Sequence, residues 1–173
     1  MNQALTCFRV PNAFLGLCLT LLCLPLIGFS QGTRLLRQPT ISQNKIAFTY
    51  ASDIWISDIT GGTATRLTST PAVESNPSFS PDGKWIAFSS NRAGGTSVYV
   101  VSAEGGMPKR LSYYPAAAAV RGWTPDGKHI IYASRRESAP GNFNRLWKVS
   151  PEGGPSEMLP VPWANDGSYK ADG

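Results

Sequence analysis

The chain has 173 residues, of which 16 are basic and 11 acidic, and its formal net charge is +5. All three cysteines lie near the start of the chain, at Cys7, Cys18 and Cys23. Residues 31–173 therefore contain no cysteine, which excludes disulfides, thiol nucleophiles and cysteine metal ligands from that part.

Residues 1–30 have the pattern of a secretory signal peptide. Arg9 supplies a short positive region, residues 13–29 are mainly apolar, and the small residues Gly28 and Ser30 occupy the −3 and −1 positions for cleavage after Ser30. A retained membrane anchor is the alternative, although a span needs about 20 mainly apolar residues and Pro25 interrupts this run. We expect a periplasmic or secreted protein that meets the membrane only through its export signal.

The first repeat is expected over about residues 38–72, within a domain that starts at residue 31. Ser42-Gln43-Asn44-Lys45 reads as a degenerate hairpin turn without proline or glycine, and Asp53-Ile54-Trp55-Ile56-Ser57 alternates as a half-buried strand does. Gly61-Gly62 marks the next turn.

The second repeat, about residues 73–116, carries the clearest turn signal, Ser80-Pro81-Asp82-Gly83-Lys84. Pro81 presets φ for the first central position, and Gly83 can take the left-handed conformation that closes a tight turn. Beyond the turn, alternate residues are apolar on both faces, which predicts a strand between two packed layers. We expect four strands, over residues 74–79, 84–90, 97–102 and 108–111.

The third repeat, about residues 117–165, restates these landmarks. Asp126 of Thr124-Pro125-Asp126-Gly127-Lys128 lies 44 positions after Asp82 (126 minus 82), and the glycine pairs that begin at Gly61, Gly105 and Gly153 keep a similar spacing. Repeats of this length built from short strands predict four-stranded blades of an all-β propeller, with a β-sandwich as the alternative. Residues 166–173 resemble the start of a fourth repeat, so we expect an incomplete propeller belonging to a longer protein.

An aromatic residue stands in the middle of the third strand of each repeat, at Trp55, Tyr99 and Trp147. A ligand-stacking platform is one interpretation, but packing of blade against blade is favoured. The repeats differ most in residues 91–96 and 135–144, which are expected to be loops of the kind that carry binding residues.

No catalytic constellation can be assembled from these residues. The single histidine, His129, follows a turn lysine and is interpreted as structural, and no nucleophile elbow, zinc-protease motif or nucleotide-binding glycine loop is present. Asp82 and Asp126 each stand alone in a turn, whereas calcium takes six to eight oxygen ligands. We therefore assign no catalytic, cofactor-binding or metal residue and expect no cofactor.

Four basic residues raise the question of nucleic-acid binding. They lack the interleaved aromatic residues of RNA-binding surfaces, so a solvated basic face with no nucleic-acid partner is the favoured interpretation for Lys109, Arg110, Arg135 and Arg136.

Three recurring features resemble TolB-type, WD-like propeller repeats. They are the turn element, the glycine pairs and the segments that follow these pairs, Arg66-Leu67-Thr68 and Arg110-Leu111-Ser112. Further motifs resemble the first propeller of the tricorn protease family, namely Val73-Glu74-Ser75-Asn76-Pro77, Val120-Arg121-Gly122-Trp123, Asn144-Arg145-Leu146-Trp147 and Glu152-Gly153-Gly154-Pro155 with Leu159-Pro160-Val161-Pro162. The resemblance implies a six-bladed propeller ahead of a seven-bladed one, a PDZ domain and a serine-peptidase core whose catalytic residues lie downstream.

The resemblance implies a non-catalytic propeller of an exported serine peptidase that admits or channels peptide substrates, in an oligomer if the protein is tricorn-like. One alternative is a TolB-like periplasmic propeller that binds a protein partner. Another is the propeller gate of a prolyl-oligopeptidase-like enzyme. Whether the whole protein is an enzyme stays open at this point, since this sequence carries no catalytic residue of its own.

Overall fold

The computed structural model describes residues 35–167. The predicted signal peptide, its cleavage site after Ser30 and most of the predicted start of a fourth repeat lie outside the described residues.

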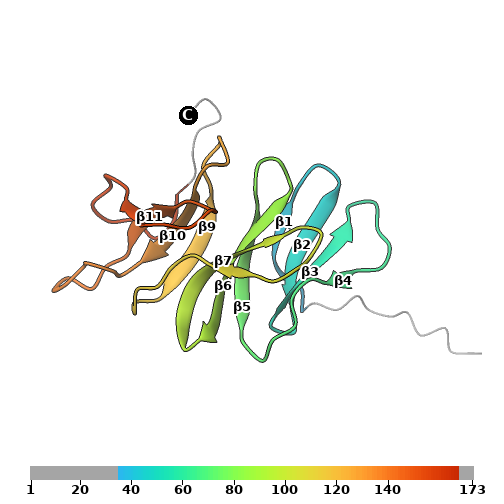
Figure 1. Ribbon diagram of the computed structural model, residues 1–173, viewed down its shortest axis with the longest axis horizontal. Helices are drawn as coiled ribbons and strands as arrows, with labels where there is room; N and C mark the ends of the chain where they lie inside the picture. Colours follow the sequence, from blue (N-terminus) through green and yellow to red (C-terminus); the bar gives the residue numbers. More distant parts are fainter. Residues whose placement is uncertain (1–34, 168–173) are drawn as a thin grey trace, which may run out of the picture. The chain divides into compact units, whose positions relative to one another are not determined.

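Three antiparallel sheets of four strands each make up the described part of the chain, and residues 35–167 contain no helix. Each sheet consists of consecutive strands, so no strand crosses from one sheet to another, and the all-β prediction is confirmed for these residues (Figure 1). The first sheet contains β1 (Arg37–Ile41), β2 (Lys45–Tyr50), β3 (Asp53–Asp58) and β4 (Thr65–Arg66). The second contains β5 (Glu74–Phe79), β6 (Trp85–Ala93), β7 (Gly95–Ser102) and β8 (Lys109–Arg110). The third contains β9 (Ala118–Trp123), β10 (Ile130–Ser134), β11 (Arg145–Val149) and β12 (Glu157–Met158).

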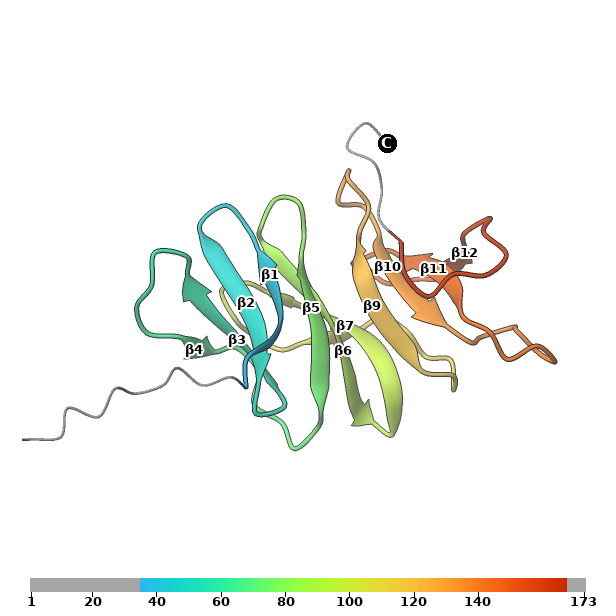
Figure 2. The ribbon, with the colours of Figure 1, turned by 180° about the vertical axis from the view of Figure 1, so that it is seen from behind.

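The first strand of each sheet contacts the first strand of the next, β1 with β5 and β5 with β9. We call β1, β5 and β9 the inner strands; the view from behind shows them following one another in chain order (Figure 2). Four-stranded meanders whose first strands adjoin are the arrangement of propeller blades.

The second sheet packs on both of its faces, as the alternation after the Asp82 turn predicted. Ile86 and Phe88 belong to one buried cluster with Ile54 and Ile56 of the first sheet. Ala87 belongs to a second cluster that contains Val120, Ile130 and Trp147 of the third sheet. Burial of apolar side chains contributes about 25 cal/mol per Å², so these two clusters are the main source of stability in the described residues.

Two of the three mid-strand aromatic residues, Tyr99 and Trp147, pack between sheets as predicted, whereas Trp55 contacts its own sheet. Tyr99 is 4% exposed and lies in the cluster with the first sheet, and Trp147 is 2% exposed and lies in the cluster with the second. Trp55 is half-buried, packs edge-on against Tyr50 and donates its indole N–H to the Tyr50 carbonyl.

The expectation of a loop over residues 91–96 is wrong. β6 continues to Ala93 and β7 begins at Gly95, so only Gly94 lies between the two strands. Gly94 has a φ of 95° and its N–H donates to the Asn91 carbonyl over 3.0 Å. This hydrogen bond closes a four-residue turn over residues 91–94, and the left-handed glycine lets Ala93 pair directly with Gly95. Residues 135–144, by contrast, form an irregular connection between β10 and β11.

Candidate functional site

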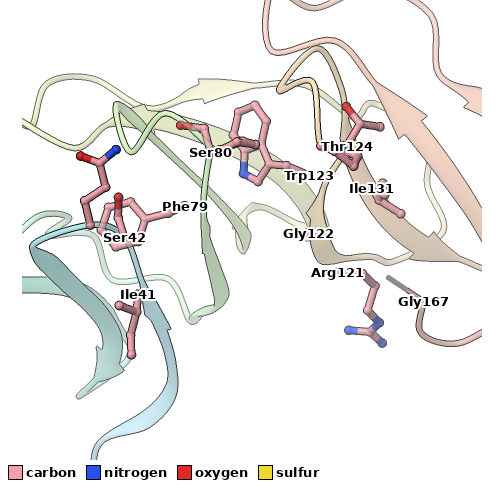
Figure 3. Close-up of a pocket in the computed structure, with 13 residues that line it drawn as sticks. Ile41, Ser42, Phe79, Ser80, Arg121, Gly122, Trp123, Thr124, Ile131 and Gly167 are labelled. Carbon is pink, nitrogen blue, oxygen red and sulfur yellow. The ribbon is translucent and has the colours of Figure 1, made fainter. Parts of the chain in front are cut away.

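A cleft of about 460 Å³ lies where the inner strands end, and it draws residues from all three sheets (Figure 3). Its walls combine apolar, hydroxyl and amide groups with one charged side chain, from Ile41, Ser42, Gln43, Phe79, Ser80, Pro81, Arg121, Gly122, Trp123, Thr124, Pro125, Ile131 and Gly167.

Two of the turns at this end of the sheets are held by an aspartate. The Asp82 carboxylate accepts hydrogen bonds from the Ser80 hydroxyl at 2.6 Å and the Lys84 N–H at 3.1 Å. Asp126 repeats both contacts, at 2.6 Å with Thr124 and 3.0 Å with Lys128. The hydroxyl hydrogen bond is the main cause that lowers the pKa of each carboxyl group below its ordinary value, with the backbone N–H next. Both aspartates therefore shape turns, which confirms their structural interpretation.

Each inner strand carries an irregularity, which lies before the cleft in β1 and β5 and at the cleft itself in β9. Gln38 in β1 and Asn76 in β5 have φ values of 52° and 54°, and the pairing register of each strand shifts there. The Asn76 N–H donates to the Gln38 side-chain oxygen over 2.8 Å, which ties β5 to β1. In β9 the register shift falls at Arg121, between Val120 and Gly122. Such bulges re-aim side chains along a strand.

Hydrogen bonds between sheets fix β9 at the side of the cleft. The Val120 N–H donates to the Ser89 hydroxyl over 2.9 Å, and the Trp123 indole N–H donates to the Ser78 carbonyl over 3.0 Å. The indole N–H of Trp123 therefore has a hydrogen-bond acceptor, and the remainder of the ring contributes apolar surface to the cleft wall.

Arg121 is the one charged residue among those that line the cleft. Its Nε donates to the Asn165 carbonyl over 2.5 Å, and its terminal nitrogens approach the Val120 carbonyl and the Asn165 amide oxygen at 3.3 and 3.4 Å. No carboxylate of residues 35–167 forms an ion pair with it.

The chemistry of these walls suits binding. Ser42 supplies a hydroxyl, whereas the hydroxyls of Ser80 and Thr124 already donate to the turn carboxylates of Asp82 and Asp126. No histidine or lysine lies among the lining residues to act as a base on a hydroxyl. Hydroxyl, amide and backbone groups beside Phe79 and Trp123 can hold a polar chain that carries some apolar side chains.

A buried ion pair lies away from the cleft, at the start of β5. Glu74 is fully buried, and its carboxylate pairs with the Arg92 guanidinium and accepts the Thr68 hydroxyl. The guanidinium lies over the rings of Phe88 and Tyr99, at 5.4 and 4.7 Å. The pair joins β6 to β5, and the Thr68 hydroxyl links it to the connection between the first and second sheets.

The remaining residues singled out from the sequence have partners in the fold. The His129 backbone pairs with Thr124, and Lys109 donates to the Glu152 carbonyl over 2.7 Å. Arg136 lies over the rings of Tyr114 and Trp147 at 4.9 and 4.4 Å, and Arg110 donates to the Ser97 hydroxyl over 3.0 Å. Arg135 is exposed. Within residues 35–167 there is no group of three or more potential metal ligands, and no helix there is long and apolar enough to cross a membrane.

Sequence reasoning missed the cleft and the Glu74–Arg92 pair. The signal for the cleft was a charged residue followed by glycine inside a predicted strand, Arg121-Gly122, since glycine in a strand interior often marks a bulge or a close approach. The ion pair joins residues 18 positions apart. The sequence pattern placed Glu74 on a predicted strand but Arg92 in the predicted loop over residues 91–96, so it did not indicate that the two side chains meet.

Comparison with known proteins gives consistent matches. The chain is 35% identical over 65 residues to tricorn protease homolog 1 of Streptomyces coelicolor, covering 38% of this chain and 6% of that protein. The crystal structure of the tricorn protease superposes with a TM-score of 0.61 and 27% identity, covering 69% of this chain and 12% of that one. TolB from Acinetobacter baumannii gives a TM-score of 0.65 and 26% identity, with coverages of 80% and 36%.

The chain thus spans only a small part of the tricorn relatives and about a third of TolB. The family model described as the tricorn protease N-terminal beta propeller domain matches residues 33–173. These residues cover every strand of the three sheets, and the chain therefore belongs to the tricorn protease N-terminal β-propeller family.

Proposed function

We propose that this chain is the non-catalytic, peptide-admitting propeller of an exported tricorn-like serine peptidase. The observation that carries the proposal is the family match over residues 33–173, which includes every strand around the cleft. The cleft supports the assignment, because its walls offer hydrogen-bonding and apolar groups, and no histidine or lysine lies among its lining residues. The full propeller has six blades in this proposal, of which the described residues form three.

The reading frame beyond the codon for Gly173 tests the enzyme part of the proposal. We expect further repeats, then a PDZ domain and a serine-peptidase core with Ser, His and an acidic partner. A frame that stops after a few more blades would overturn this part.

The admission role has a separate test on the purified propeller. A fluorescent peptide library should bind it weakly, and widening the cleft with Trp123→Ala should change which peptides bind. Lys84→Ala is the matched control, because Lys84 is an exposed turn residue that does not line the cleft. Binding that is unaffected by Trp123→Ala would contradict passage through the cleft.

A TolB-like binding protein is the second candidate, favoured by the superposition with the Acinetobacter baumannii TolB over 80% of this chain. In that case a folded protein, rather than a peptide, is the partner of the propeller. Co-purification from the exporting cell distinguishes the two, because a stoichiometric folded partner with no peptidase domain in the frame favours the TolB-like function.

Export is part of the proposal and rests on the pattern of residues 1–30. Cleavage after Ser30 would give a mature protein that begins at Gln31 in the periplasm or outside the cell. Mass spectrometry of the protein from fractionated cells measures this directly. A cytoplasmic protein that retains Met1 would exclude export, and a membrane-bound one that retains Met1 would favour the anchor.

A further inference from the structure

The inner strands carry three charged residues, Arg37, Glu74 and Arg121. Glu74 is buried and paired with Arg92, so its charge is neutralised within the fold. Arg37 is exposed, Arg121 is half-buried, and neither forms an ion pair with any residue of the described part of the chain. The inner strands therefore carry positive charge without compensation.

Arg121 is held in a way that leaves its charged end available. A guanidinium has five N–H donors, and the one short contact of Arg121 uses Nε, at 2.5 Å from the Asn165 carbonyl. The contacts of its terminal nitrogens, at 3.3 and 3.4 Å, are longer than an ordinary hydrogen bond and go to neutral oxygens. The guanidinium is thus held through Nε, and its terminal nitrogens retain N–H donors for a ligand.

The surroundings strengthen the attraction of this charge for an anion. Phe79, Trp123 and Ile131 place apolar surface in the same cleft, and no carboxylate lies among the lining residues. Figure 3 shows the Arg121 side chain extending from β9 on the side of Gly167, away from Trp123 and Ile131. Low-dielectric walls around charge of one sign focus the electrostatic potential, and arginine binds carboxylates with two parallel hydrogen bonds.

We propose that the cleft at the ends of β1, β5 and β9 selects peptides with acidic side chains, and that Arg121 binds their carboxylates. This inference rests on the proposed peptide-admitting function and adds a charge preference to it. Arg37 lies on β1, which β5 separates from β9, and it adds a weaker long-range attraction because it is exposed to solvent and does not line the cleft.

The test uses two peptides of equal length, each labelled with a neutral dye on the amino terminus and amidated at the carboxyl terminus. One carries two glutamates and the other two glutamines at the same positions, so side-chain carboxylates are the only difference. Fluorescence anisotropy with the mature chain measures both affinities. We expect the glutamate peptide to bind about fivefold more tightly in dilute salt, and the preference to shrink as salt shortens the Debye length.

Four variants separate charge recognition from a structural role of Arg121. Arg121→Gln should abolish the preference, and Arg121→Lys should keep part of it, because a lysine carries the charge without the two-pronged geometry. Lys109→Gln removes one charge from β8, the last strand of its sheet, and should change nothing. Asn165→Ala removes one acceptor of Arg121 while keeping the charge, so it should retain the preference even if residues near 165 loosen.

Equal binding of the two peptides to the wild-type chain would overturn the charge preference and leave the peptide-admitting function standing. A preference that survives in Arg121→Gln would overturn the role of Arg121. If neither peptide binds, both this inference and peptide admission at the cleft fail. Circular dichroism of each variant shows that a loss of preference comes from a folded protein.

Discussion

At the scale of single residues, the Glu74–Arg92 pair is the contact whose loss should cost most. Glu74 is fully buried, and the Arg92 side chain is 18% exposed, with its guanidinium over two aromatic rings. The attraction between two buried charges is largely offset by the cost of removing them from water, so the pair adds little net stability. Removal of one partner, however, leaves an uncompensated buried charge. The pair therefore acts more as a constraint on how β6 meets β5 than as a source of stability.

The first prediction concerns this pair. Arg92→Ala should lower the free energy of unfolding by about 3–5 kcal/mol, because Glu74 then stays buried without its cation. Lys148→Ala is the control, since Lys148 pairs with an exposed Glu157 and its loss should cost less than about 1 kcal/mol. Urea unfolding followed by fluorescence measures both variants, and similar costs for the two would contradict a buried ion pair.

The turn aspartates give a prediction with a defined pH range. The folded-state pKa of Asp82 is lowered, so its contribution to stability is present above the ordinary value of 3.8 and is lost as pH falls through the folded value. Asp82→Asn should therefore be less stable than the wild type at neutral pH, and the gap should close as the pH falls below 3.8. Thermal unfolding at a series of pH values measures the gap, and Asp126→Asn should behave alike. A gap that does not change with pH would show that the carboxylate charge plays no part.

At the scale of strands, a hydroxyl contact recurs in the first two sheets. In the first sheet, Thr68 follows the β4 arginine by two positions, and its hydroxyl accepts a hydrogen bond from the Ile54 N–H at 2.9 Å. In the second sheet, Ser112 follows the β8 arginine by two positions, and its hydroxyl accepts one from the Val98 N–H at 2.8 Å. The same arginine, Arg66 or Arg110, donates to the backbone carbonyl of that hydroxyl residue. The short outer strands are thus held by side chains as well as by their few backbone pairs.

This contact yields a prediction with an internal control. Ser112→Ala leaves the buried Val98 N–H without an acceptor and should cost about 1–3 kcal/mol in the free energy of unfolding. Ser112→Thr should be nearly neutral, because threonine makes the same contact at position 68. Chemical denaturation compares the two, and an equal loss in both variants would point to packing instead of the hydrogen bond.

Most of the strand pattern could be predicted from the sequence because it depends on neighbouring residues. The strand Glu74–Phe79 matches the expected range, and Gly83 has the expected left-handed φ, at 72°. The alternation of Ile86 and Ala87 predicted two packed faces, and those residues do belong to different clusters. The hairpin at Gly94 was not predicted, because a run of Asn-Arg-Ala-Gly-Gly is typical of a loop. The sequence does not show that the facing strands pair across it.

At the scale of the described part of the chain, the second sheet has a packed neighbour on each face. Ile86, Phe88 and Val101 pack toward the first sheet, and Ala87, Val98 and Val100 toward the third. Stability in repeat proteins is approximately a sum of repeat and neighbour-interface contributions, so the middle repeat should open last.

Hydrogen exchange tests this order. Backbone amides of β6 and β7 should exchange most slowly, and those of the two-residue strands β4, β8 and β12 should exchange fastest. Exchange followed by mass spectrometry of peptides resolves the three sheets. Slower exchange in β2 and β3 than in β6 and β7 would contradict the view that the shared middle sheet is the most stable.

The cleft belongs to this largest scale, which explains why the sequence did not reveal it. Its residues come from three repeats, and Ile41 and Thr124 of its walls are more than 80 positions apart (124 minus 41). Arg121 lines the cleft only because β9 packs beside β5 and because the register of β9 shifts at Arg121. Periodicity reports which face of a strand is buried, whereas a site between repeats depends on contacts that periodicity does not encode.

Each sheet is formed by one continuous stretch of the chain, and this affects how the gene tolerates duplication or deletion of a repeat. Within residues 35–167 every strand pairs only with strands of its own sheet, so duplication or deletion of one whole repeat leaves the strand pairing inside each remaining sheet intact. What such an event must preserve is the side-chain match between neighbours, such as Ser89 with Val120 and Ser78 with Trp123. Ring size can therefore vary by unequal recombination between repeats, while these junction residues limit which repeats can become neighbours.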